Sequence, residues 1–151
     1  MVDAFRRNQP WAECVVGDIQ TRLPIVDSFF DRIIAVHVLE HLPNLPSAIE
    51  EIYRLIDKTK GELSVVIPCE GSLAYWAARR ISAERIFRKR YRMSYKWFIR
   101  REHVNAPNEI IEELSKYFYA TSKSFFPIPL PIMNLNLCIG LTFKPKVLNP
   151  D

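Results

Sequence analysis

Two short apolar runs, separated by an amphipathic stretch, dominate the first half of the chain. Asp31–Val38 is almost continuously apolar and rich in β-branched residues, which is typical of a strand buried on both faces of a parallel sheet. Glu62–Pro68 has the same character. Between them, Pro46–Asp57 spaces its apolar residues like a helix with one buried face, and Lys58 and Gly61 favour the end of that helix. The pattern predicts a right-handed βαβ unit.

The flanking segments extend this pattern in both directions. Ala12–Gly17 is expected to form a short strand that ends in a Gly-Asp turn. Pro107–Tyr117 has the apolar spacing of a helix, while Tyr119–Phe126 and Leu135–Phe143 predict two further strands. The proline-rich connection at 127–131 cannot be a central strand, because proline has no amide hydrogen to donate. The order of these elements predicts an α/β fold.

Positive charge is concentrated in one segment after the second predicted strand. The chain has a net charge of +4, but residues 71–104 hold ten lysines and arginines against two glutamates, a balance of about +8. Leu73–Arg80 and Ser82–Lys89 predict two basic amphipathic helices with interspersed aromatic residues. We favour the hypothesis that this segment forms a lid over a substrate. The alternatives are a surface that binds nucleic acid or an anionic membrane, and a helical face that is simply solvated.

Composition places the chain among globular proteins of one domain. It has 151 residues, of which 48% are hydrophobic and 25% charged. No run reaches the ~20 apolar residues of a spanning helix, and no apolar stretch near the start resembles a signal peptide. The scattered Cys14, Cys69 and Cys138 favour reduced, buried thiols in a cytoplasmic protein.

A candidate ligand site follows from the predicted sheet. Ligands of open α/β sheets bind outside the carboxyl ends of the strands, which here carry Gly17-Asp18-Ile19, His37–His41 and Cys69-Glu70-Gly71. The Asp18 carboxylate can accept a hydrogen bond from a ligand amino group, and Ile19 can supply an apolar wall. The alternative is that Asp18 only caps a turn.

The order of several short motifs resembles that of class I S-adenosylmethionine-dependent methyltransferases, in particular the type 11 group. The motifs are Gly-Asp at 17–18, Leu-Pro at 23–24, Phe-Asp at 30–31, Leu-Glu-His-Leu-Pro at 39–43, a helix with Glu51 and Arg54, and Gly-x-Leu-x-Val-x-x-Pro at 61–68. The likeness is strong over Val15–Pro68 and weak over His103–Lys146, where His-Val-Asn, a helix and two strands follow.

The resemblance implies S-adenosylmethionine as the cofactor and assigns residues to it. In this family the acid at Asp18 accepts from the adenine amino group, and the residue at Ile19 packs on the purine ring. The residues at His37 and Val38 line the cofactor near its methionine portion.

The resemblance also implies a partial Rossmann-like methyltransferase fold that lacks the first βαβ unit. We expect one partial domain over 1–151, with a core βαβ unit in 1–70, a helical basic insertion in 71–104, and a helix with two closing strands in 105–151. Residues 1–11 contain no glycine, so the family's glycine-rich turn is not found there. We therefore expect an N-terminally truncated chain with impaired cofactor binding.

Candidate acceptor chemistry lies in histidines and arginines. His41 and His103 are candidate general bases, since imidazole is suited to removing a proton near neutral pH. Alternatively, His41 caps a loop and His103 is a hydrogen-bonded surface residue. Arg79, Arg80 and Arg100 are candidates for binding an anionic acceptor, either a small molecule or a glycan- or lipid-type molecule.

Two other functions compete with methyl transfer. His37–His41 matches H-x-x-E-H, the spacing of one class of zinc peptidases, but that motif requires a helix, whereas His37 ends a strand and Pro43 follows. We therefore expect no metal. The second is a noncatalytic remnant or interaction module that binds an anionic partner through the basic insertion. Nucleic acid is not expected, because no compact nucleic-acid motif is present.

Overall fold

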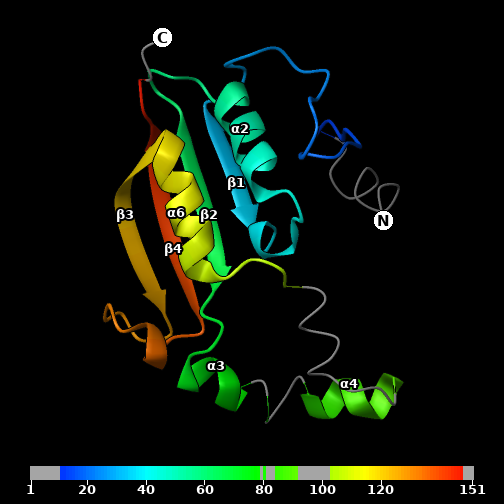
Figure 1. The fold of residues 1–151 in the computed structure, drawn as a ribbon, viewed down its shortest axis with the longest axis vertical. Coiled ribbons are helices and arrows are strands. Elements are labelled where there is room, and N and C mark those ends of the chain that lie inside the picture. Colours follow the sequence, from blue (N-terminus) through cyan, green and yellow to red (C-terminus); the bar gives the residue numbers. More distant parts are fainter. Residues whose placement is uncertain (1–10, 79, 81–83, 92–102, 148–151) are drawn as a thin grey trace.

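Four strands form one mixed sheet in the computed structural model, which describes residues 11–78, 80, 84–91 and 103–147 (Figure 1). The strands are β1 (Arg32–Val36), β2 (Glu62–Pro68), β3 (Phe118–Phe126) and β4 (Cys138–Pro145), in the spatial order β1-β2-β4-β3. β1 and β2 are parallel, and β4 is antiparallel to both β2 and β3. The arrangement confirms the partial Rossmann-like α/β fold.

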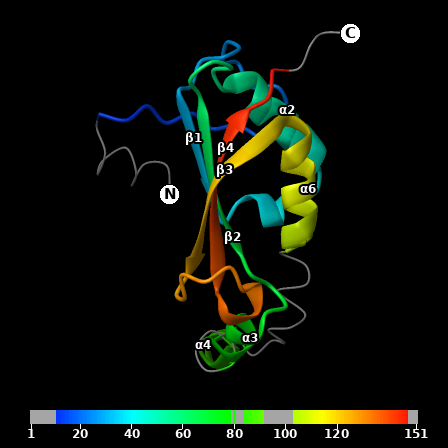
Figure 2. The same ribbon diagram turned by 90° about the vertical axis from the view of Figure 1, so that its left-hand side faces the viewer.

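Two helices cover one face of this sheet. Figure 2 shows α2 (Leu45–Leu55) and α6 (Pro107–Tyr117) on the same side of the strands. Their apolar residues pack against alternate residues of the central strands, where every second side chain points to the same face. The fully or almost fully buried residues of this layer are Ala48, Ile49, Ile52, Leu63, Val65, Ile67, Ile110, Leu114, Phe118 and Phe143.

The predicted βαβ unit is present as β1, α2 and β2. The bounds of β2 and α6 are those that the sequence predicts. The strand β1 is three residues shorter than predicted, and α2 begins one residue earlier and ends two residues earlier. Lys58 stabilises the end of α2, as expected, by donating to the carbonyl oxygens of Tyr53 and Ile56. Its Nζ lies 2.8 Å from the Ile56 oxygen.

The predicted strand at Ala12–Gly17 is wrong. These residues form an irregular segment, and Val15 and Val16 are exposed. A strand requires a neighbour with which to exchange backbone hydrogen bonds. Of the described residues, none pairs with this segment, and β1 remains at the edge of the sheet.

The last strand begins later than predicted. Met133–Leu135 forms the 3₁₀ helix η3, and β4 starts only at Cys138. Asn136 causes the delay: its buried side-chain amide donates to the carbonyl oxygens of Leu130 and Ile132, at 3.1 and 2.9 Å. These bonds hold the chain in a tight loop before it enters the sheet.

The other face of the sheet is not covered by a helix in the part of the chain that the structure describes (Figure 2). Ile34 and Val36 of β1 point to this face and are 65% and 51% exposed. Buried strands of α/β proteins are normally covered on both faces. The sequence pattern predicts that both faces of β1 are buried, whereas the structure leaves the face with Ile34 and Val36 exposed.

The basic insertion contains two helices, as predicted; the first is shorter than predicted and the second begins and ends two residues later. α3 (Leu73–Ala78) and α4 (Glu84–Tyr91) lie beyond the carboxyl end of β2, away from the layer of α2 and α6 (Figure 1). α3 buries none of its residues. Among the described residues, no helix has the length and apolar character needed to cross a lipid bilayer.

We predict that Gly61→Ala destabilises the βαβ unit. A Cβ atom at Gly61 would lie 2.7 Å from the Ile56 side chain and still closer to the Asp57 carbonyl oxygen. Overpacking of this kind costs about 1–3 kcal/mol, measurable as a loss in free energy of unfolding in urea. Gly140→Ala is the matched control, because its Cβ would meet the rotatable Ser124 hydroxyl. Equal stability of both variants would contradict the prediction.

Candidate functional site

The carboxyl end of β1 turns sharply into the candidate site. His37 follows the strand with a φ of 51°, a left-handed conformation that is uncommon outside glycine. Its backbone amide still donates to the Val66 carbonyl oxygen, at 3.1 Å, so the strain occurs where the chain leaves the sheet. The 3₁₀ helix η1 (Leu39–His41) follows. Backbone strain of this kind concentrates at functional sites.

The structure brings together His41 and His103, which the sequence suggests separately. Their ring centroids lie 4.6 Å apart in an edge-to-face arrangement. Glu40 lies beside them, and we refer to Glu40, His41 and His103 as the imidazole–carboxylate cluster. His41 is partly exposed and His103 almost buried, with side-chain exposures of 37% and 11%.

Glu40 is the buried member of this cluster. Its side chain is 2% exposed, and its Oε1 atom lies 3.1 Å from His37 Nδ1 and 3.9 Å from His41 Nε2. Its Oε2 atom is also buried and has no hydrogen-bond partner among the described residues. A buried carboxylate oxygen without a partner is costly.

Asn105 fastens the His103 segment to η1. The backbone amides of Val104 and Asn105 both donate to the Glu40 carbonyl oxygen, at 2.8 and 3.2 Å. The Asn105 side-chain amide donates to the carbonyl oxygens of Leu39 and Leu42, at 2.8 and 2.7 Å. Asn105 is not among the functional residues predicted from the sequence, although the His-Val-Asn motif that contains it is the available signal. Separately, His103 Nδ1 is hydrogen-bonded to Glu70 Oε1.

Asn105→Ala should loosen this site. It removes two hydrogen bonds to buried carbonyl groups, each worth about 0.5–1.5 kcal/mol, so we expect the free energy of unfolding to fall by about 1–3 kcal/mol. Asn108→Ala is the control, because Asn108 is exposed on α6. Urea denaturation measures both variants, and a loss at Asn108 as large as that at Asn105 would count against this role.

Asp18 forms the turn that the sequence offers as one alternative. Its Oδ1 atom accepts from the backbone amide and side-chain amide of Gln20, at 3.0 and 3.1 Å. Both hydrogen bonds lower the pKa of Asp18, and the one from the backbone amide has the larger effect. Gln20 Oε1 in turn accepts from the backbone amide of Asn44, at 2.7 Å. Because Asn44 caps α2, the Asp18 turn is linked to the start of that helix, just after the loop that carries the cluster.

The remaining cofactor candidates lie around the same edge. Val38 is 40% exposed at the start of η1, whereas Ile19 is partly buried and packs against the core. Ile19 also lines an apolar cavity of about 340 Å³ between residues 15–25 and the β1–α2 layer. Asp18, His37 and Val38 do not line this cavity. No residue of the imidazole–carboxylate cluster lines it either, so the cavity and the cluster are separate features.

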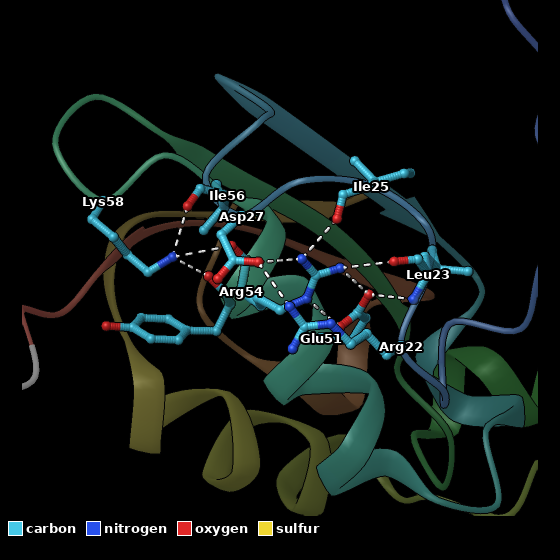
Figure 3. Close-up of polar contacts among 9 residues, drawn as sticks. Arg22, Leu23, Ile25, Asp27, Glu51, Arg54, Ile56 and Lys58 are labelled. Atoms are coloured by element: carbon cyan, nitrogen blue, oxygen red, sulfur yellow. Dashed lines mark hydrogen bonds and ion pairs between the residues drawn. The ribbon is translucent and has the colours of Figure 1, made fainter. Parts of the chain in front are cut away.

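Arg54 clamps the segment after the Asp18 turn onto α2 (Figure 3). Its guanidinium donates to both carboxylate oxygens of Glu51, at 2.8 and 2.7 Å, and to the carbonyl oxygens of Leu23 and Ile25, at 3.2 and 2.8 Å. Glu51 Oε1 also accepts from the Leu23 amide, at 2.8 Å. The family resemblance includes this pair, and the structure gives it a positioning role.

Glu51→Gln should reduce stability in a pH-dependent way. The Arg54 hydrogen bonds hold the pKa of Glu51 below its ordinary value of 4.5. A lowered folded-state pKa contributes stability above the unfolded-state value, and this is lost as the pH falls through the folded-state pKa. We expect a loss of about 1–3 kcal/mol at neutral pH that shrinks in acid. Denaturation at about pH 7 and about pH 3.5 tests this.

Glu112→Gln is the matched control for this experiment. It removes the same charge from an exposed position on α6. An equal loss in both variants, or a Glu51→Gln deficit that does not depend on pH, would refute the clamp.

Only one of the three proposed acceptor-binding arginines lies within the described residues. Arg80 is exposed, and its guanidinium lies over the Trp76 ring, 5.4 Å from the centroid. Arg79 and Arg100 lie outside the described residues. A guanidinium held over an aromatic ring can still donate N–H groups to an anion.

One family model matches the first part of the chain. Residues 1–63 match the family model Methyltransf_11, described as a methyltransferase domain. This match covers less than half of the chain. None of the curated proteins compared matches the sequence.

Solved structures share the fold of this chain. A Pyrococcus horikoshii protein has a TM-score of 0.63 at 14% identity, and a TehB-like S-adenosylmethionine-dependent methyltransferase from Corynebacterium glutamicum has 0.63 at 15%. The N-methyltransferase NodS from Bradyrhizobium japonicum, crystallised with S-adenosyl-L-homocysteine, has 0.55 at 17%. The matches cover 96%, 96% and 94% of this chain, in that order. The chain spans 65%, 62% and 59% of those proteins.

Proposed function

We propose that this chain is part of an S-adenosylmethionine-dependent methyltransferase that acts on a small-molecule acceptor. The observation that carries the proposal is the gathering of the Asp18 turn, the strained His37 loop and the His41–His103 pair around β1 and the start of α2. Ligand sites of open α/β sheets lie at such an edge.

Asp18 and its neighbours suit the adenosine end of the cofactor. Asp18 is exposed, and its Oδ2 atom makes no hydrogen bond within the described part of the chain, so it can accept from the adenine amino group. Ile19 would pack on the purine, and His37 and Val38 would lie toward the methionine portion. S-adenosylmethionine supplies the methyl group when bound. We propose that these residues by themselves bind it only weakly.

The imidazole pair serves the acceptor in this proposal. His41 is the more exposed ring and can meet an incoming group, while Glu70 fixes the orientation of His103. An imidazole at this position would take a proton from an acceptor hydroxyl or amine, and the rigid loop would supply the positioning on which methyl transfer depends. Arg80 would bind an anionic acceptor of small-molecule, glycan or lipid type.

Titration with S-adenosyl-L-homocysteine tests the cofactor site. A hydrogen bond to a charged group is worth about 1.5–3 kcal/mol, so Asp18→Ala should weaken binding by about tenfold to a hundredfold in calorimetry. Asp31→Ala is the matched control: Asp31 is an exposed carboxylate that pairs with Lys60 at the other end of β1.

Two outcomes would overturn the proposal. Equal affinity of the Asp18 and Asp31 variants would remove Asp18 from the cofactor site. No binding at millimolar ligand would favour the noncatalytic interaction module, whose partner would contact the basic helices.

A further inference from the structure

The imidazole–carboxylate cluster has the composition and placement of a metal site. We propose that Glu40, His41 and His103 bind one divalent transition-metal ion, with Zn²⁺ the best match to two imidazoles and a carboxylate. The proposal rests on the proposed function only in that the ion would lie where the acceptor is expected. Binding of the ion itself does not require the cofactor.

The distances suit a site that closes slightly around an ion. One ligand atom from each residue lies within 4.8 Å of the other two, and His41 Nε2 is 3.9 Å from Glu40 Oε1. Zinc bonds of about 2.0–2.2 Å place two ligands of a tetrahedral ion roughly 3.4 Å apart. Small side-chain rotations are sufficient to reach that spacing.

The buried Glu40 carboxylate provides independent evidence for a cation. Its Oε2 atom is buried and has no hydrogen-bond partner among the residues described, although it belongs to a side chain that is only 2% exposed. Buried charges in proteins are paired or coordinate metals. Because Oε1 is the oxygen nearer to His41, a rotation of the Glu40 carboxyl group or bidentate binding would bring Oε2 to a cation held between Glu40 and the two imidazoles.

The surroundings of His103 match those of a metal-binding histidine. Its Nδ1 atom is hydrogen-bonded to Glu70, so the carboxylate fixes the tautomer in which Nε2 carries the lone pair. Metal-binding histidines commonly donate their second ring nitrogen to a carboxylate in this way. The four hydrogen bonds made by Val104 and Asn105 hold this segment against η1 before any ion binds.

This ligand set differs from the H-x-x-E-H match in the sequence. In that match, His37 and His41 would be the ligands on one helix, but His37 lies in a strained turn and instead approaches Glu40 with its Nδ1 atom. The structure replaces His37 with His103, which comes from a distant segment. The sequence-based expectation of no metal depends on the helix requirement, and the cluster does not need a helix.

The partial exposure of His41 leaves room for an external ligand. Three protein ligands with an open fourth position are typical of catalytic rather than structural zinc sites. An acceptor hydroxyl at the open position would have its pKa lowered by the ion. The ion would then perform the acceptor activation assigned above to the imidazole pair.

Zinc titration of the full chain tests the proposal, by competition with a chromogenic chelator. We expect one equivalent of Zn²⁺ to bind, and Glu40→Gln, His41→Ala and His103→Ala each to weaken binding by more than about tenfold. Glu112→Gln is the matched control for Glu40→Gln: it lies at an exposed position on α6 and should leave the affinity unchanged. Circular dichroism establishes that each variant folds, and Co²⁺ absorption in the visible range reports coordination directly.

Contrary outcomes are equally clear. If His37→Ala abolishes Zn²⁺ binding and His103→Ala retains it, the ligands are those of the H-x-x-E-H motif and not those of the cluster. No stoichiometric binding to the folded chain would overturn the metal site altogether. S-adenosyl-L-homocysteine is titrated separately. A chain that binds Zn²⁺ but not this ligand would count against the methyltransferase proposal alone. A chain that binds this ligand but not Zn²⁺ would count against the metal site alone.

Discussion

Burial of α2 against β1 and β2 is the interaction on which the rest of this structure depends. Ala48, Ile49 and Ile52 are almost completely excluded from solvent, and their packing fixes both ends of the helix in space. The start of α2 holds the Asp18 turn through Asn44 and Gln20, and its last turns hold residues 23–27 through Arg54. The polar contacts on both ends therefore rely on one apolar interface, since hydrogen bonds of this kind are individually worth little in water.

The two ends of α2 have different chemistry. At the C-terminal end, Glu51 and Arg54 satisfy each other, and Arg54 and Lys58 donate to nearby carbonyl groups, as expected for a positioning network. At the N-terminal end, Glu40 keeps one buried oxygen without a partner among the described residues, and His37 keeps a strained backbone. The fold satisfies its polar groups where it needs rigidity and leaves them unsatisfied where a ligand is expected to bind.

The sequence predicts those parts of the fold whose structure is set locally. The apolar periodicity of 46–57, 62–68 and 107–117 specifies α2, β2 and α6 almost to the residue, because one buried face determines each. It fails at Ala12–Gly17, since a strand also needs a partner, and at the start of β4, where the Asn136 side chain bends the chain. His41 and His103 could be suggested singly, but their contact depends on Asn105, whose bonds to a distant loop leave no periodic signal.

The open edge of β1 offers a place where another molecule can stabilise the folded chain. β1 has a neighbour on one side only within the described residues, and its exposed Ile34 and Val36 add apolar area beside unpaired backbone groups. Such an edge is a template for further strand pairing. Any molecule that covers it in the folded state, including a second copy of the chain, shifts the folding equilibrium by mass action. If a second copy pairs there, the free energy of unfolding will rise with protein concentration, so variants are compared at one concentration.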